Sequence, residues 1–295
     1  MRLFNLAKSR ADRLHRQAQA ESEAGNSEAA LALYEKCLAV DPERPATLYN
    51  IGLIHKYRKE WDKSLAFNSR AYALDSADEA VRWNLAIAAT ALRRWSIARK
   101  TWIACGIEMS DVDEPITMNF GKTPVRLNPD AGGEVVWGTR IDPVRVVIDS
   151  IPYPESGYRF ADVVLHDGAP MGSRIVGERE YSVFNVLELF EPSKHSTYVA
   201  SVDVPDPAGL ERLSRIAADC GVEMEDWTAT VRTLCKQCSE GVPHDAHDQE
   251  GNKAWNLERR IGLACEVSAQ IDRLVNRCRN EADLETRSVA LALRA

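Results

Sequence analysis

A spacing of 34 residues repeats through the first third of the chain. Small residues recur at Ala18, Gly52 and Ala86, each in the same register of an apolar helical pattern. A period between about 20 and 50 residues is typical of arrays in which one supersecondary unit stacks on the next copy of itself. The period predicts a right-handed stack of six helices over residues 11–112.

The same period continues in the second helix of each unit. The positions related by 34 residues are Ala30, Ser64 and Ala98, then Tyr34, Asn68 and Trp102, then Cys37, Ala71 and Cys105. This pattern resembles the tetratricopeptide repeat (TPR), a pair of antiparallel helices with small residues at their crossing. The resemblance covers units 11–44, 45–78 and 79–112. It departs from the family at Glu21, a position that is usually aromatic, and in the third unit, which has no closing proline. An unrelated array of helical hairpins is the alternative.

In the TPR family, segments of partner proteins lie in a concave groove lined by the first helices. The resemblance places these residues in that groove: His15, Gln19, Tyr49, Asn50, Leu53, Lys56, Trp83, Asn84, Ile87 and Thr90. A chaperone-binding subclass needs cations there, but Ala80 and Asn84 hold the third-unit positions, so that subclass is not expected. The aromatic residues would anchor apolar side chains of an extended segment, while the Asn amides would bond its backbone. The alternative is a groove filled by the protein's own chain.

From about Thr123 the pattern changes from helical to alternating, which is typical of half-buried strands. Strands are expected at 125–127, 134–141, 144–151, 158–166, 173–177, 181–190 and 197–204. A helix is expected at 208–220, with Asp206 as N-cap and Pro207 at its first position. Short strands with tight turns and one covering helix predict an α+β module built on a mostly antiparallel sheet or small barrel.

The C-terminal run from Ala254 to Cys278 places apolar residues at steps of three and four, which predicts a long amphipathic helix. The tail from Glu285 to Ala295 is expected to fray. The fold class is therefore α+β, with three domains. These are three TPR-like hairpins in residues 1–112, a β-rich module in 113–253, and a C-terminal helix with its tail in 254–295.

A cluster of cysteine and histidine residues is the sharpest chemical motif. Cys235 and Cys238 are separated by two residues, and His244 and His247 follow closely. Two thiolates and two imidazoles suit tetrahedral Zn²⁺, and four protein ligands leave no open position for a substrate, so the predicted zinc is structural. Two alternatives remain, namely a surface loop with incidental Cys and His, and a redox cysteine pair.

Other candidate chemistry is weaker. His166 and Asp167 end a predicted strand, and Ser156 lies in the turn before it, but no nucleophile-elbow pattern accompanies them. The glycines at 132 and 133 lack both the Lys and the following helix of a phosphate-binding loop. A capped hairpin end is the simpler interpretation of His166 and Asp167.

Charge and cysteine usage bound the partners and the compartment. The chain has 37 Lys and Arg against 44 Asp and Glu, a net charge of −7, which argues against binding nucleic acid through bulk electrostatics. No apolar stretch approaches the ~20 residues that span a bilayer, so no membrane association is expected. Lys8 and Arg10 interrupt the start of the chain before a signal peptide could form. Seven cysteines, with Cys37 and Cys105 in helical patterns, favour a reducing cytoplasm over a disulfide framework.

These observations together favour a non-enzymatic protein that binds another protein through the TPR groove and the β-rich module. An acidic chain that meets a basic partner, as immunity proteins meet secreted toxins, is one version, and an adaptor is another. The alternative is a metal-dependent enzyme with a site between the two modules.

Overall fold

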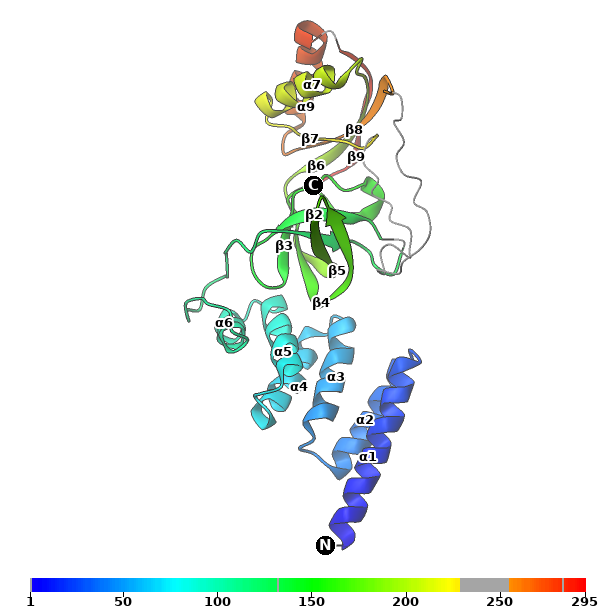
Figure 1. The fold of residues 1–295 in the computed structure, drawn as a ribbon, viewed down its shortest axis with the longest axis vertical. Helices are drawn as coiled ribbons and strands as arrows, with labels where there is room; N and C mark the ends of the chain where they lie inside the picture. The colour runs from blue at the N-terminus through cyan, green and yellow to red at the C-terminus, as the bar shows by residue number, and fades with distance from the viewer. Residues whose placement is uncertain (1, 132, 229–254, 283) are drawn as a thin grey trace. The chain divides into compact units, whose positions relative to one another are not determined.

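The computed structural model describes residues 2–131, 133–228, 255–282 and 284–295 of the chain (Figure 1). It divides into two compact units, Met1–Thr117 and Met118–Ala295. The first is helical and the second is rich in strands, so the protein is α+β, as expected.

Six helices form the first unit, as the 34-residue period predicts. They are α1 (Arg2–Glu23), α2 (Ser27–Val40), α3 (Pro45–Tyr57), α4 (Trp61–Leu74), α5 (Glu79–Ala91) and α6 (Trp95–Ala104). Each odd-numbered helix packs on the helix that follows it, and neighbouring hairpins pack through α2 with α3 and α4 with α5. Pro45 opens α3 with its fixed φ, and the Asp78 side chain caps α5 by accepting from the amides of Ala80 and Val81.

The turn inside each hairpin repeats at the same period. Gly25, Lys59 and Arg93 all have φ between 55° and 80°, the left-handed region. In each turn the next amide returns to a carbonyl five residues earlier, for example from Glu60 to His55 at 2.9 Å. This is the Schellman ending, which satisfies carbonyls that a helix end leaves free. The three hairpins therefore turn in the same way, although only the first has the glycine that the left-handed conformation favours.

The helix crossings carry the predicted small residues. Ala18, Gly52 and Ala86 are buried, as are their partners on the second helices, Ala30, Ser64 and Ala98. At the central crossing the Ser64 hydroxyl donates to the Gly52 carbonyl at 2.9 Å. A Cβ on Gly52 would lie 2.5 Å from Asn68 Nδ2, so this close approach requires glycine.

A closed five-stranded barrel opens the second unit. Its strands follow one another around it as β1 (Lys122–Arg126), β2 (Val135–Arg140), β3 (Arg145–Ile148), β4 (Val163–Val176) and β5 (Arg179–Glu191). Neighbours are antiparallel, except that β1 closes on β5 in parallel. The apolar core consists of Val125, Leu127, Val136, Val146, Ile148, Val164 and Val186. The expected strands at 158–166 and 173–177 contribute to one long, irregular β4.

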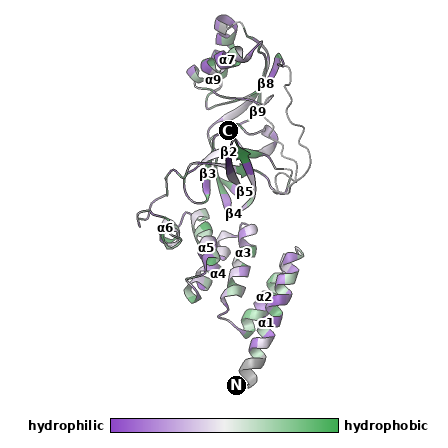
Figure 2. Cartoon of the chain, in the orientation of Figure 1, coloured by the Kyte–Doolittle hydropathy of each residue, from purple (hydrophilic) through white to green (hydrophobic). Residues whose placement is uncertain are grey.

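A four-stranded antiparallel sheet completes the second unit in the order β7-β8-β6-β9. Its strands are β6 (Ser196–Asp203), β7 (Glu223–Asp226), β8 (Glu258–Cys265) and β9 (Glu285–Leu293). The helices α7 (Pro207–Asp219) and α9 (Ser268–Arg277) pack against β6 and β8 in one apolar core. Figure 2 shows hydrophilic and hydrophobic residues interspersed along both helices, as expected of helices that bury one side.

The opposite face of this sheet meets the barrel. Trp227, just after β7, packs with Ile151 and Ala264, and its indole nitrogen donates to the Ile151 carbonyl at 3.1 Å. The ring lies directly against the backbone of β8 at Gly262, where an added Cβ would come within 2.4 Å of Trp227 Cε2 and Cζ2. Gly262 is thus the close-approach position that joins the sheet to the barrel.

The predicted long helix at 254–278 is wrong. Residues 258–265 form β8, an inner strand between β6 and β7, and helix α9 begins only at Ser268. In this segment Ile261 and Leu263 enter the helix-side core, while Ala264 faces the barrel. A strand buried on both faces has apolar residues at both parities, so spacings of three and four arise by chance. The tail expected to fray is also a strand, β9, paired with β6.

Candidate functional site

The predicted groove residues differ widely in exposure. His15, Lys56, Asn84, Ile87 and Thr90 are buried, Tyr49, Asn50, Leu53 and Trp83 are partly buried, and Gln19 is exposed. Hydrogen bonds within the first unit explain why several of these side chains are buried.

Two groove positions of the first two hairpins are used in packing between helices. The His15 ring nitrogen Nδ1 lies 2.9 Å from the Thr47 hydroxyl, which ties α1 to α3, and burial lowers the pKa of His15. Asn50 bonds the hydroxyl of Tyr34 on α2. Burial raises the pKa of Tyr34 to about 12, so this phenol stays neutral. The Asn50 amide is therefore engaged inside the array.

The third hairpin uses its groove positions in a similar way. The Thr90 hydroxyl donates to the Ala86 carbonyl at 2.8 Å and lies 3.3 Å from the Trp102 indole nitrogen, which can donate to it. The Trp83 ring meets Trp102 edge-on, with centroids 4.9 Å apart. Aromatic pairs in this geometry contribute about 0.5–1.5 kcal/mol beyond area burial. Trp83 therefore stabilises the hairpin.

An open stripe remains on α3. Leu53 is partly buried, and Tyr57, four residues later, is 58% exposed. Residues four apart share one face of a helix, so the two side chains are neighbours. The Lys56 ammonium lies 4.5 Å from the centroid of the Tyr57 ring. Tyr57 was absent from the predicted groove set, although its spacing of four from Leu53 is a signal that could have found it.

An extended segment follows α6 and packs back on it. The buried guanidinium of Arg99 donates to the carbonyls of Ser110, Glu114 and Pro115 at 2.7–2.9 Å. Ile116, at the end of this segment, is fully buried. The Ser96 amide of α6 also donates to the Asp113 carboxylate at 2.9 Å, so Arg99 and Ser96 together hold this segment on the last helix.

His166, Asp167 and Ser156 do not assemble into a catalytic triad. His166 is fully buried with Nδ1 2.6 Å from the backbone carbonyl of Asp167, and the Ser156 hydroxyl donates to the Tyr153 carbonyl at 2.7 Å. Burial lowers the pKa of His166 to about 3, so the ring is neutral at physiological pH. Its ring packs at 4.8 Å from that of Phe184. The geometry is that of a packed barrel residue.

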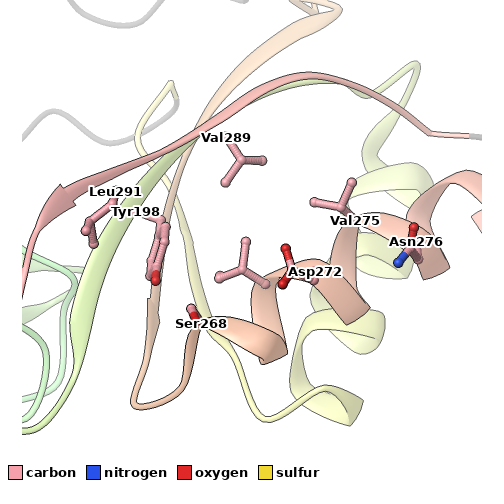
Figure 3. Close-up of a pocket in the computed structure, with 8 residues that line it drawn as sticks. Tyr198, Ser268, Asp272, Val275, Asn276, Val289 and Leu291 are labelled. Carbon is pink, nitrogen blue, oxygen red and sulfur yellow. The ribbon is translucent and has the colours of Figure 1, made fainter.

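A hollow of about 280 Å³ lies between α9 and the strands β6 and β9 (Figure 3). Tyr198, Val289 and Leu291 line it from the strands. From α9 come Ser268, Ile271, Asp272, Val275 and Asn276. Its floor is apolar, and Asp272 is its one charged lining residue among those the structure describes.

The predicted zinc ligands Cys235, Cys238, His244 and His247 lie outside the described residues. Within the described parts of the chain, no three His, Cys, Asp or Glu side chains are grouped to hold a metal ion. None of the helices described there is long and apolar enough to cross a membrane.

Comparison with known proteins gives a distant similarity in structure. No protein-family model matches the chain, and no curated protein matches it in sequence. A solved structure of a hypothetical protein from Neisseria gonorrhoeae is similar to 60% of this chain and 96% of its own, at 13% identity and a TM-score of 0.28. A likeness this low carries no functional argument.

Proposed function

We propose that residues 11–112 are a TPR-type array and that the protein is a non-enzymatic binding protein. Its partner protein binds to the face formed by the first helix of each hairpin, α1, α3 and α5, which is called the first-helix face below. The exposed aromatic ring of Tyr57 beside Leu53 on α3 is the observation that carries this proposal. Crossings and turns that recur every 34 residues support the repeat assignment. Because the Asn50 amide already bonds Tyr34 inside the array, recognition falls to Leu53 and Tyr57, and the partner contributes apolar side chains to α3.

The charge of the second unit favours a basic partner. Residues 1–117 contain 17 Lys and Arg against 16 Asp and Glu, a net charge of +1, whereas residues 118–295 contain 20 against 28, a net charge of −8. The whole excess of acid therefore belongs to the second unit. Complementary charge speeds association, as in immunity-type inhibitors that meet basic toxins, and an adaptor that recruits a basic protein has the same requirement.

A structural zinc on Cys235, Cys238, His244 and His247 remains part of the proposal, on the evidence of ligand type and spacing alone. Elemental analysis of protein purified without added metal tests it. One zinc per chain in the wild type and none in the Cys235→Ser/Cys238→Ser variant is expected. Zinc that survives the double substitution would remove the site.

Co-purification from the native host tests the binding function. Tagged full-length protein, a Tyr57→Ser variant and a Leu74→Ser control are captured in parallel and their companions identified by mass spectrometry. Leu74, on α4, is 43% exposed and lies off the first-helix face. A partner retained by the wild type and the control but lost from Tyr57→Ser is expected. Retention by all three proteins would exclude α3 as the recognition surface.

A further inference from the structure

The strand β9 combines three features that have no role in the helical array. It is the last strand in the order β7-β8-β6-β9, and among the described residues it pairs only with β6. Leu291 on this strand is 41% exposed. The hollow under α9 opens directly beside it (Figure 3). A free strand edge presents unpaired backbone groups, which an extended segment can complete.

The register of β9 sets the length of that segment. Pairing with β6 is regular from Ser288, opposite Ser201, to Leu291, opposite Tyr198, and it shifts at both ends of this stretch. Such irregularities twist an edge away from further pairing, so only these four residues form a straight edge. Val289 and Leu291 both face the hollow, because alternate residues of a strand share a face. An added strand would direct its own alternate side chains into the same space.

The lining of the hollow sets the chemistry of those side chains. Val275, Val289 and Leu291 offer apolar contact, and the hollow has room for a few side chains rather than for a larger ligand. Asp272 is exposed and forms no ion pair with any described residue. A cationic side chain with an apolar stem satisfies both requirements, since its stem packs on the floor while its charge reaches the carboxylate. The net charge of −8 on residues 118–295 favours the same choice.

We propose that β9 and the hollow beneath α9 bind an extended segment of a partner protein, with apolar and Lys or Arg side chains alternating toward the hollow. The segment adds a fifth strand to the sheet along Ser288–Leu291, and its cation pairs with Asp272. This surface is independent of the array, so it can succeed or fail without the function proposed for α3.

Fluorescence anisotropy on the full chain tests the proposal. The probe is the labelled peptide Thr-Leu-Thr-Lys-Thr-Leu-Thr, with two controls, one carrying Glu in place of Lys and one with N-methylated backbone at alternate residues. The parent peptide should bind, and both controls should bind at least about tenfold more weakly, the equivalent of about 1.4 kcal/mol. An N-methylated peptide that binds as well as the parent would overturn strand addition.

Protein variants complete the test. Asp272→Asn and Leu291→Arg should each weaken binding of the parent peptide about tenfold. Glu223→Gln, at an exposed acid on the opposite edge strand, and Leu74→Glu, on α4, should leave that binding unchanged. Circular dichroism checks that each variant is folded. Equal losses of peptide affinity in Asp272→Asn and Glu223→Gln would show that the overall negative charge attracts the peptide, and not Asp272 in the hollow. Reversible dimers that the peptide does not dissociate would assign the edge to a second copy of the chain. Either outcome, or no binding of the parent peptide at all, refutes the proposal.

Discussion

Substituting Gly52 by alanine probes the central crossing of the helical array. A Cβ at this position would lie 2.5 Å from Nδ2, 2.9 Å from Cγ and 3.0 Å from Oδ1 of Asn68, against ordinary separations of about 3.5–4.0 Å between carbon atoms. The Asn68 side chain has little room to withdraw, because it is fully buried and its amide donates to the Ser64 carbonyl at 2.9 Å. The added methyl group must therefore move one helix relative to the other.

Two opposing effects set the magnitude. Overpacking a core typically costs about 1–3 kcal/mol. Replacing glycine by alanine inside a helix stabilises it by about 1 kcal/mol. Gly52→Ala should therefore lower the free energy of unfolding by up to about 2 kcal/mol, and Gly52→Leu by more. In an Asn68→Ala background the clash is gone, and the same Gly52→Ala change should stabilise the protein by about 1 kcal/mol.

Urea unfolding followed by far-UV circular dichroism measures this double-mutant cycle. The expected signature is a reversal of sign, with a coupling free energy of about 1–3 kcal/mol between positions 52 and 68. Ala86→Gly, at the equivalent crossing of the third hairpin, is the matched control and should destabilise by about 1 kcal/mol or more through helix propensity. If Gly52→Ala stabilised both backgrounds equally, Asn68 would not pack at the crossing.

Three further predictions concern the turns, the sheet and the barrel. Lys59→Gly should stabilise the protein by about 0.4–1 kcal/mol, because Lys59 has φ of 59°, a conformation that glycine adopts more readily than lysine. Gly25→Ala, at the equivalent turn, should destabilise the protein for the same reason. Thermal melts of the two variants test this, and stabilisation by both would contradict the shared turn geometry. Gly262→Ala should lift the Trp227 ring from β8 and cost about 1–3 kcal/mol, with a shift of tryptophan emission; unchanged emission and stability would refute that packing. Because burial lowers the pKa of His166 from 6.5 to about 3, the unfolded chain binds the extra proton between these values, so stability should fall by about 1.4 kcal/mol per unit as pH drops below 6.5. His166→Gln should flatten that dependence in urea unfolding at pH 5 and 7, and a curve parallel to the wild type would exclude this cause.

The helical array could be predicted from the sequence because its signal is periodic and local. Ala18, Gly52 and Ala86 recur at one spacing, and helices followed at that spacing. The turns at Lys59 and Arg93 could not be predicted, because neither residue type favours the left-handed conformation that the Schellman geometry imposes. There the tertiary arrangement overrides the local preference of the residue.

The candidate site was harder to predict, because burial depends on partners distant in sequence. His15 meets Thr47 across 32 residues, and Asn50 meets the hydroxyl of Tyr34 on the preceding helix. Positional analogy placed both side chains in the groove, but hydrogen bonds between helices engage them in packing. The prediction of one long helix over residues 254–278 was wrong for a different reason. An inner strand followed by a helix produces apolar spacings that one long helix also explains.

The most direct measurement of the central claim is the affinity of the full chain for the partner captured from its host, determined by isothermal titration calorimetry with Leu53→Glu and Leu74→Glu side by side. Both variants introduce one carboxylate at an apolar position of the array. Leu53 lies on α3 beside Tyr57, on the first-helix face, whereas Leu74 lies on α4, outside that face. Binding through the first-helix face predicts at least about a tenfold rise in Kd for Leu53→Glu, about 1.4 kcal/mol, and little change for Leu74→Glu. Equal affinities for the two variants would contradict recognition by the first-helix face.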